Sequence, residues 1–370
     1  MAPNPRVGAV LVRGGEVVGR GWHAAVGGPH AEAVALAEAG ERARGATLYV
    51  TLEPCAHHGR TPPCADAVVA AGVARVVACH GDPNPDVAGG GFARLRAAGV
   101  EVEVGGLAAA AVRLNLPFLV AATERRPAVT LKWAMSLDGR IATAGGESQW
   151  ISSPRGRRWA LALREEHDAI LVGSGTVLAD DPRLDRRLGL AGEPGLRAVL
   201  DRRLRLAAWA AAAGAAGRRL FSVEGPLVIY TEAAAAAEPR EAERPAGLAG
   251  LAGLAALGAT VVTLPAVTPA AVLRDLYARG AHSLLVEGGA EVLGAFVASG
   301  LYDQVAADCA PLLLGGHGAP GPLGGAGAAT LAGAPRLDRL DARRHGADVV
   351  LSGLREGCLD TLLARVLPAS

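Results

Sequence analysis

Two short stretches decide how the first part of the chain folds: Pro29-His-Ala-Glu32 and Thr51-Leu-Glu-Pro-Cys-Ala-His-His-Gly-Arg-Thr-Pro-Pro-Cys64. They supply one imidazole, from His30, and two thiolates, from Cys55 and Cys64, which are good ligands for Zn²⁺. Three protein ligands leave the fourth position open for water, and bound zinc lowers the pKa of that water to about 7. Glu32 lies two residues from His30 and can move protons without binding the metal. The pattern predicts a hydrolytic zinc site with Glu32 as its catalytic residue.

The spacing of the two cysteines departs from the common pattern. Nucleobase deaminases combine His-x-Glu with Pro-Cys-x-x-Cys, whereas eight residues separate Cys55 from Cys64 here. Gly59 and the Pro62-Pro63 pair suit a loop that leaves Cys64 at the head of the next helix. The alternative is a closed, purely structural site with His57 or His58 as a fourth ligand, but such a site does not need a glutamate beside its ligand.

Hydrophobic runs on either side of these motifs predict an α/β fold. We expect a hairpin from residues 7–12 and 16–19, strands at 47–51, 75–79 and 100–104, and helices at 30–39, 64–71 and 92–98. The predicted order is β-β-α-β-α-β-α-β. Short β-branched runs that alternate with Ala-rich helical stretches are typical of parallel sheets covered by helices.

A second α/β pattern starts after a polar segment at residues 123–126, which we interpret as a linker. The predicted domains are therefore residues 1–123 and 124–370. Further strands are expected at 128–133, 169–172, 198–200, 227–230, 260–264, 283–286 and 304–309. The Ala- and Gly-rich segments 207–219 and 232–258 read as surface insertions or weakly packed helices.

The overall composition limits the partners. With 37 basic and 36 acidic residues the net charge is +1, which provides no broad field for nucleic acid or anionic lipid. Five cysteines do not make a secreted disulfide framework, and no signal-peptide pattern opens the chain. The uncharged stretch between Arg244 and Arg274 is mostly Ala and Gly interrupted by prolines, so we do not expect it to span a membrane. We expect a cytoplasmic protein, as a homo-oligomer, with a small-molecule substrate.

Several longer segments resemble one family closely. They are Pro3-Asn-Pro-Arg-Val-Gly-Ala-Val10, Pro29–Glu32, Tyr49–Cys64, Asp82–Val87, Leu131–Arg140, Ser148–Ile151, Asp168–Pro182, Val286–Gly289 and Ala310–Gly316. In these segments the chain resembles the bifunctional riboflavin-biosynthesis deaminase–reductases. The long step from Cys55 to Cys64, filled with His-Gly-Arg-Thr-Pro-Pro, is specific to that family among zinc deaminases.

The resemblance implies a cytidine-deaminase-like α/β/α domain followed by a dihydrofolate-reductase-like α/β domain, with Zn²⁺ and NADPH as cofactors. The implied reactions are hydrolytic deamination of 2,5-diamino-6-(5-phosphoribosylamino)pyrimidin-4(3H)-one and reduction of its ribosyl group to ribityl, giving 5-amino-6-(5-phosphoribitylamino)uracil. Family members usually begin with a further helix before the Pro-Asn-Pro run. This sequence does not show that helix: either its start is misplaced or truncated, or the helix is genuinely missing, and the loss of the helix would expose one face of the first sheet.

The resemblance also implies roles for residues of the second half. The implied NADPH contacts are Ala134, Trp150, Thr176, Asp180, Gly289, Ala290, Glu291, Val292, Leu293, Gly294 and Ala295. The implied substrate contacts are Lys132, Ser148, Arg164, Leu184, Arg187 and Glu287, together with Asn4, His57 and Arg60 in the first half. Glycines after the strand at 283–286 would let the backbone approach a pyrophosphate at a helix start. Arg164 and Arg187 could hold a phosphate, although a solvated charge is the usual role of any single arginine.

Some alternatives stay open at this point. His23 could face the deaminase pocket or cap its own loop. A deaminase acting on nucleic-acid bases is disfavoured by the near-zero net charge. A catalytically inactive homologue used for binding, or a deaminase whose Ala-rich second half no longer reduces, would keep the same motifs.

Overall fold

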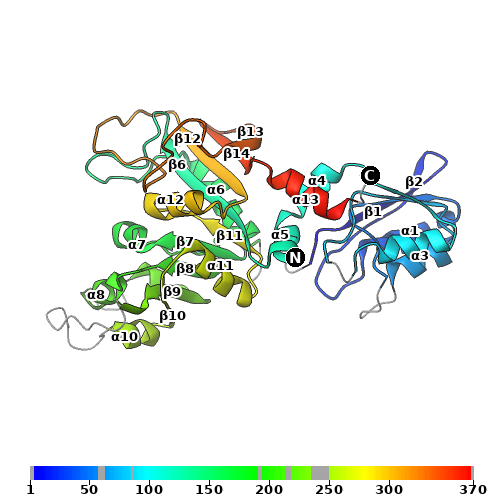
Figure 1. Ribbon diagram of the computed structural model, residues 1–370, viewed down its shortest axis with the longest axis horizontal. Coiled ribbons are helices and arrows are strands. Elements are labelled where there is room, and N and C mark those ends of the chain that lie inside the picture. Colours follow the sequence, from blue (N-terminus) through cyan, green and yellow to red (C-terminus); the bar gives the residue numbers. More distant parts are fainter. Residues whose placement is uncertain are drawn as a thin grey trace. The chain divides into compact units, whose positions relative to one another are not determined.

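The computed structural model describes residues 4–56, 63–84, 87–190, 194–212, 218–234 and 250–367. The chain forms two compact units, drawn in Figure 1. The first consists of Met1–Arg125 together with Gly357–Ser370, and the second is Arg126–Glu356.

The first unit is built on a five-stranded sheet in the order β2-β1-β3-β4-β5. β1 pairs antiparallel with β2 and β3, while β3, β4 and β5 are parallel. The elements are β1 Gly8–Arg13, β2 Glu16–Trp22, α1 Ala31–Ala39, η1 Gly40–Ala43, β3 Thr47–Val50, α2 Cys64–Ala70, β4 Arg75–Ala78, α3 Gly90–Ala97, β5 Glu101–Val104, α4 Ala108–Leu114, α5 Leu116–Glu124 and α13 Cys358–Val366. Up to β5 this is the element order that the sequence predicts, with the short η1 turn added.

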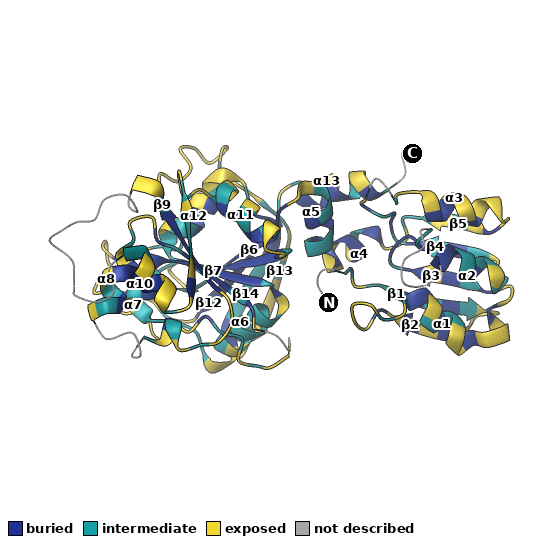
Figure 2. Ribbon diagram, turned by 90° about the horizontal axis from the view of Figure 1, so that it is seen from below, coloured by how far each residue is buried: buried dark blue, intermediate teal, exposed yellow. Residues whose placement is uncertain are grey.

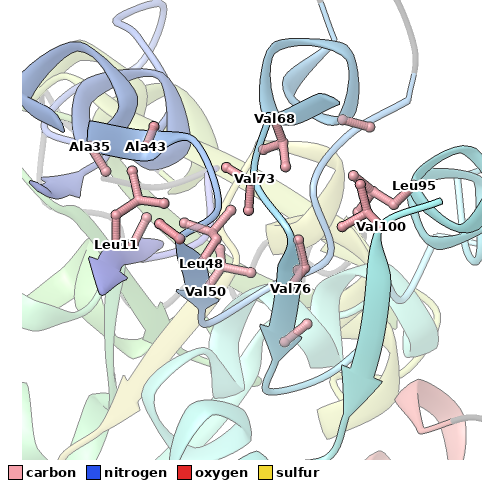
Figure 3. Packing of buried hydrophobic residues seen from close by; sticks show 14 of the residues in the cluster. Leu11, Ala35, Ala43, Leu48, Val50, Val68, Val73, Val76, Leu95 and Val100 are labelled. Atoms are coloured by element: carbon pink, nitrogen blue, oxygen red, sulfur yellow. The ribbon is translucent and has the colours of Figure 1, made fainter. Parts of the chain in front are cut away.

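One face of this sheet carries the core of the unit. Alternate strand residues such as Leu11, Leu48 and Val76 are fully buried, and they pack with Val68 of α2 and Leu95 of α3. Figure 3 shows these side chains converging between the strands and the helices. Side chains alternate between the two faces of a strand, so every second residue of each strand packs against helices α1, α2 and α3. On the other face Tyr49 of β3 is 46% exposed.

The second unit contains a nine-stranded sheet in the order β10-β9-β8-β7-β11-β6-β12-β14-β13. The strands from β10 to β12 are parallel to their neighbours, and β14 and β13 add an antiparallel hairpin at one edge. The strands are β6 Ala128–Ser136, β7 Ala169–Gly173, β8 Leu196–Leu200, β9 Leu227–Glu232, β10 Ala259–Leu264, β11 Ser283–Val286, β12 Gln304–Ala310, β13 Leu337–His345 and β14 Asp348–Arg355.

Helices cover both faces of this second sheet. They are α6 Pro154–Glu166, α7 Ser174–Asp180, α8 Arg205–Ala212, η3 Arg219–Phe221, α10 Gly250–Ala256, α11 Pro269–Ala278 and α12 Ala290–Ser299. Residues of α11 and α12 pack on one face, while α8 and α10 pack on the other. Because both faces are covered, β7 and β11 are buried along their whole length, and Figure 2 shows buried strands in dark blue between helices with exposed outer surfaces.

Three features differ from the expectations. The expected linker is partly helical, because α5 continues to Glu124. Residues 357–370 belong to the first unit, although the predicted boundary placed everything after 124 in the second domain; α13 packs against α4 there, and Gly81 donates its N–H to the Val366 carbonyl at 2.7 Å. The segment 207–219, for which a surface insertion or a weakly packed helix is expected, begins within helix α8, whose Ala207 and Ala210 are buried in the core. Residues 235–249 of the other Ala-rich segment lie outside the described part.

Among the described residues, no helix is both long and apolar enough to cross a bilayer.

Candidate active sites

The structure brings His30, Cys55 and Cys64 together in the first unit. His30 is the N-cap residue of α1, Cys55 follows β3, and Cys64 opens α2. The His30 Nδ1 atom lies 3.2 Å from Cys64 Sγ and 3.6 Å from Cys55 Sγ, and all three ligand atoms lie within 4.8 Å of one another. With Zn–S and Zn–N bonds of about 2.3 and 2.1 Å, ligand atoms of a tetrahedral site lie about 3.6 Å apart. The cluster therefore fits Zn²⁺.

The thiolate state that a metal needs is favoured locally. The backbone N–H of Cys64 donates to Cys55 Sγ at 3.3 Å. The hydrogen bond from the Cys64 thiol, with help from His30, lowers the pKa of Cys55. Burial opposes this shift, and the pKa of Cys64 is itself raised by its hydrogen bond with Cys55 and by burial, so the thiolate is favoured at Cys55.

Glu32 lies in the first turn of α1 and is only 3% exposed. Burial raises its pKa to about 7. Its helix holds it two residues from the His30 ligand, so the carboxyl group is fixed beside the cluster without being one of its three members. A buried carboxyl group that can take up and release a proton is the group that hydrolytic deamination needs.

His23 performs both of the roles left open for it. Its Nδ1 donates to the Pro29 carbonyl at 3.1 Å, so Nε2 is left to accept from the Asn4 side-chain amide at 2.9 Å. The His23 ring also meets the His30 ring edge-on, with 5.7 Å between centroids. His23 thus stabilises the loop before α1 and orients Asn4. The other two implied substrate contacts of this unit, His57 and Arg60, lie outside the described residues, as does His58.

Glu53 is a residue that the sequence reasoning did not single out. Its carboxylate is 4% exposed. Oε2 accepts from the N–H groups of Asp82 and Gly89, and Oε1 accepts from those of Gly91 and Phe92, all at 2.9–3.1 Å. Glu53 therefore ties the segment before Cys55 to the start of α3. The signal was present in the sequence, because a glutamate stands directly before Pro54-Cys55.

Replacing Glu53 with Gln is expected to destabilise the first unit by about 2–4 kcal/mol, since an amide can replace only one of the two accepting oxygens and leaves two buried N–H groups without an acceptor. Urea denaturation followed by fluorine NMR of fluorotryptophan at Trp22, the single tryptophan of this unit, measures the change. Glu101→Gln, at a position where the side chain is 69% exposed, is the matched control and should change stability by less than about 0.5 kcal/mol. Equal stability of the two variants would contradict the anchoring role.

In the second unit, two strand ends meet at the carboxyl edge of the parallel sheet. Gly173, at the end of β7, donates its N–H to the Gly288 carbonyl at 2.9 Å. Gly288 has φ of +119°, a conformation that favours glycine, and a β-carbon on Gly289 would lie 3.4 Å from Thr176 Oγ1. Ligands of parallel sheets bind at this edge, and helix starts there accept phosphates. The open glycine backbone between α7 and α12 fits the pyrophosphate of NADPH.

The other implied cofactor contacts divide into two groups. Asp180, at the end of α7, accepts from Ser148 Oγ at 3.4 Å and from Gln149 Nε2 at 3.2 Å, and Trp150 is 69% exposed beneath the Arg157 guanidinium. Ala134 lies within the carboxyl-terminal half of β6. Leu293, by contrast, is 1% exposed and belongs to the hydrophobic core. Within segment 289–295, Leu293 and Gly294 are therefore buried, whereas the first turn of α12 and Ala295 are accessible.

Arg164 and Glu287, both implied substrate contacts, bind each other. Arg164 donates Nε to Glu287 Oε1 at 3.0 Å and Nη2 to Oε2 at 2.5 Å, with the two side chains 14% and 7% exposed. Burial would raise the pKa of Glu287, but the Arg164 and Lys132 cations lower it below its usual value. Lys132 lies on β6, where burial lowers its pKa. This ion pair means that Arg164 orients Glu287 and has little capacity left for a phosphate.

The remaining implied substrate residues differ in access. Arg187 is 41% exposed and pairs with Asp185 at 2.5 Å. Leu184 is only 2% exposed and its side chain lies in the core. Leu184 is therefore not accessible to a ligand in this structure, while the Arg187 side chain is accessible.

The fold and the two sites define a class: a zinc-dependent deaminase unit joined to an NADPH-dependent reductase unit. The family model described as "RibD C-terminal domain" matches residues 127–351, and the one described as "Cytidine and deoxycytidylate deaminase zinc-binding region" matches residues 1–80. The chain belongs to the RibD family. It is a riboflavin-biosynthesis enzyme with a deaminase and a reductase activity that uses Zn²⁺ and NADPH.

Relatives and solved structures agree with this membership. Riboflavin biosynthesis protein RibD of Aquifex aeolicus is 41% identical over 322 residues, covering 87% of this chain and 85% of that protein. The Escherichia coli protein of the same name is 40% identical over 360 residues, covering 94% and 93%. The structure of Acinetobacter baumannii RibD, form 1, is similar with a TM-score of 0.77 and 36% identity, covering 96% of this chain and 93% of that one. The resemblance and the fold class read from the sequence are confirmed.

Proposed function

We propose that the first unit deaminates 2,5-diamino-6-(5-phosphoribosylamino)pyrimidin-4(3H)-one and that the second reduces the ribosyl group of the product to ribityl. A solved structure of a Thermotoga maritima diaminohydroxyphosphoribosylaminopyrimidine deaminase and 5-amino-6-(5-phosphoribosylamino)uracil reductase is 34% identical, with a TM-score of 0.76 over 95% of this chain and 92% of that one. The observation that carries the proposal is the buried Glu32 beside the three-residue ligand cluster. It supports hydrolysis rather than a structural metal.

In the deaminase unit, His30, Cys55 and Cys64 would hold zinc, which supplies an activated water when bound. Glu32 would take a proton from the attacking water and deliver it to the exocyclic nitrogen, so that a C–O bond replaces the C–N bond at the ring carbon and ammonia departs. Asn4, oriented by His23, holds the pyrimidine, and His57 and Arg60 serve the same substrate. The catalytic step thus depends on a carboxyl group that water cannot reach freely.

In the reductase unit, NADPH supplies the hydride. Thr176, Asp180 and the first turn of α12 position the cofactor, with Ala134, Ser148 and Trp150 at the same sheet edge. Glu287, held by Arg164, and Lys132 face the opened sugar near its first carbon. Arg187 is the better phosphate ligand of the two arginines, because its side chain is accessible and that of Arg164 is engaged.

We also propose that residues 1–123 and 124–356 carry the two activities, with residues 357–370 completing the first unit. A cytoplasmic homo-oligomer that binds neither nucleic acid nor membrane is the corresponding proposal for its setting. The net charge of +1 supports the absence of nucleic-acid and membrane binding, because nucleic acid and anionic lipid attract excess positive charge. Light scattering of the purified protein tests the oligomer, and titration with labelled DNA at low salt tests the absence of binding.

A coupled assay on one purified sample tests both reactions. Ammonia release and NADPH oxidation are recorded on the diaminopyrimidine substrate with zinc present. We expect ammonia first and NADPH oxidation after it. Ammonia without NADPH oxidation would show a deaminase that has lost reduction, and neither signal would identify an inactive homologue.

A further inference from the structure

A row of charged side chains crosses five neighbouring strands of the second sheet. Residues that face each other in a ladder point to the same side of a sheet, as do residues two apart along a strand. Ala306 of β12 pairs with Lys132, Asp308 pairs with Val350 of β14, and Asp348 pairs with His345 of β13. Glu287 follows β11, whose Val286 pairs with Leu131. The charged row, in strand order, is Glu287, Lys132, Asp308, Asp348 and His345.

Helix α6 covers the charged row. Its residue Arg164 binds Glu287, and its Trp159 ring lies 5.7 Å from the His345 ring. Gly156 leaves no room for a side chain, since a β-carbon there would overlap the carboxylate oxygens of both Asp308 and Asp348. The two carboxyl groups therefore lie side by side beneath the first turn of α6.

Asp308 and Asp348 are unequal partners. Both are 1% exposed. Asp348 Oδ2 accepts from the Ser153 N–H at 2.8 Å and from Ser153 Oγ at 2.6 Å, at the start of α6. Three carboxylate oxygens accept no hydrogen bond of good geometry from the described residues. They are both oxygens of Asp308 and Oδ1 of Asp348. A buried carboxylate left in this state costs stability.

The charges around Asp308 show what it is coupled to. Burial raises its pKa and the Asp348 carboxylate raises it further, whereas the Ser152 side chain, Lys132 and His345 lower it. Burial lowers the pKa of Lys132, Glu287 raises it, Arg164 lowers it, and Asp308 raises it by the smallest of these effects. Lys132 is thus flanked by an acid on each side along the charged row.

Lys132 is also the single lysine among the 37 lysine and arginine residues of the chain. Arginine stays protonated in proteins, whereas an ammonium group is compact and its pKa responds to its surroundings. A chain that uses arginine at every other basic position keeps an amine at the one place between Glu287 and Asp308.

We propose that Asp308 is a positioning residue of the reductase site, whose buried carboxylate, on the same face of the neighbouring strand, stabilises the positive charge of Lys132 without pairing with it directly, at a cost to the stability of the fold. The proposal rests on the proposed role of Lys132 at the opened sugar. A protonated amine at that place stabilises negative charge that develops on a sugar oxygen. Asp348 holds the start of α6 and acts on Lys132 only through Asp308.

The test compares Asp308→Asn with Asp348→Asn in the full-length protein. Isotope-labelled lysine gives one side-chain signal, because Lys132 is the single lysine. In Asp308→Asn the pKa of Lys132 should fall by about one unit, the usual size of an effect of a nearby opposite charge. The basic limb of the reductase pH profile should move with it, while ammonia release stays unchanged. In Asp348→Asn the pKa of Lys132 should not fall, because Asp308 then ionises more readily.

Stability separates this role from a merely structural one. A raised folded-state pKa means that Asp308 favours folding below its unfolded pKa of about 4 and loses that contribution as pH rises through the folded value. At pH 8, Asp308→Asn should therefore raise the melting temperature of the second unit by about 2–4 °C, with no gain at pH 4. The new amide can also donate to Asp348 Oδ1.

An unchanged Lys132 titration in Asp308→Asn would overturn the proposal, as would a lower melting temperature at pH 8 with both activities falling together. A shifted titration with an unaltered reductase profile would instead remove Lys132 from the proposed reaction and leave its coupling to Asp308 standing. The two failures are therefore distinguishable.

Discussion

Replacing Glu32 with Gln is expected to reduce ammonia release by about 10³-fold, the size of a general acid–base contribution. The amide keeps the shape of a side chain that is 3% exposed, so the pocket should stay intact. It cannot take a proton from water at neutral pH. The assay is ammonia release on the diaminopyrimidine substrate at saturating concentration.

The same helix offers a matched control for this variant. Glu38→Gln changes an exposed residue of α1 whose side chain accepts from the Arg20 N–H, and it should leave ammonia release unaltered. Metal analysis of Glu32→Gln should show undiminished zinc, and NADPH oxidation on deaminated substrate should persist. Wild-type ammonia release from Glu32→Gln would eliminate Glu32 as the proton carrier.

The second large effect is expected from Arg164→Met. Removing one member of a buried ion pair leaves an uncompensated charge and costs about 3–5 kcal/mol. Glu287, whose folded-state pKa is lowered by Arg164, contributes stability that is present above its unfolded pKa of about 4.3 and is lost as pH falls through the folded value. The loss should therefore be large at pH 7 and shrink toward pH 3. Thermal unfolding at several pH values measures it.

Two further variants test whether Arg164 acts as the partner of Glu287 or as a phosphate ligand. Adding Glu287→Gln to Arg164→Met removes the stranded carboxylate and should recover most of the stability, although not the reductase activity. Arg187→Met, at an exposed position, should change stability by less than about 0.5 kcal/mol but raise the KM for the phosphorylated substrate. If Arg164→Met instead raised only this KM with no loss of stability, Arg164 would be a phosphate ligand and not the partner of Glu287.

The parts that the sequence predicted well are those in which the chemistry is local. The approach of His30, Cys55 and Cys64 follows from ligand type and from the helix starts that carry two of them. The order of elements up to β5 follows from the period of two in buried strands. Residue types at short spacing carry this information because each motif lies within one or two neighbouring elements.

Contacts between residues far apart in the chain could not be predicted from the sequence. Arg164 and Glu287 are 123 residues apart, so each reads alone as a solvated or substrate-binding charge. Asp308 is the one charged residue of β12, which marks it as unusual without showing Lys132 or Asp348 near it. Leu359, Leu362 and Val366 form the buried apolar side of α13. Such a pattern predicts packing on a core but does not identify α4 as the partner.

The return of α13 to the first unit affects how the protein is made. Domains usually fold in the order in which they leave the ribosome, but the deaminase unit lacks α13 until residues 358–366 have been synthesised. The reductase unit is therefore fully translated before its predecessor can be completed. A polypeptide released before residue 358 has been added would contain the catalytic residues of both units. Only its reductase unit would be complete.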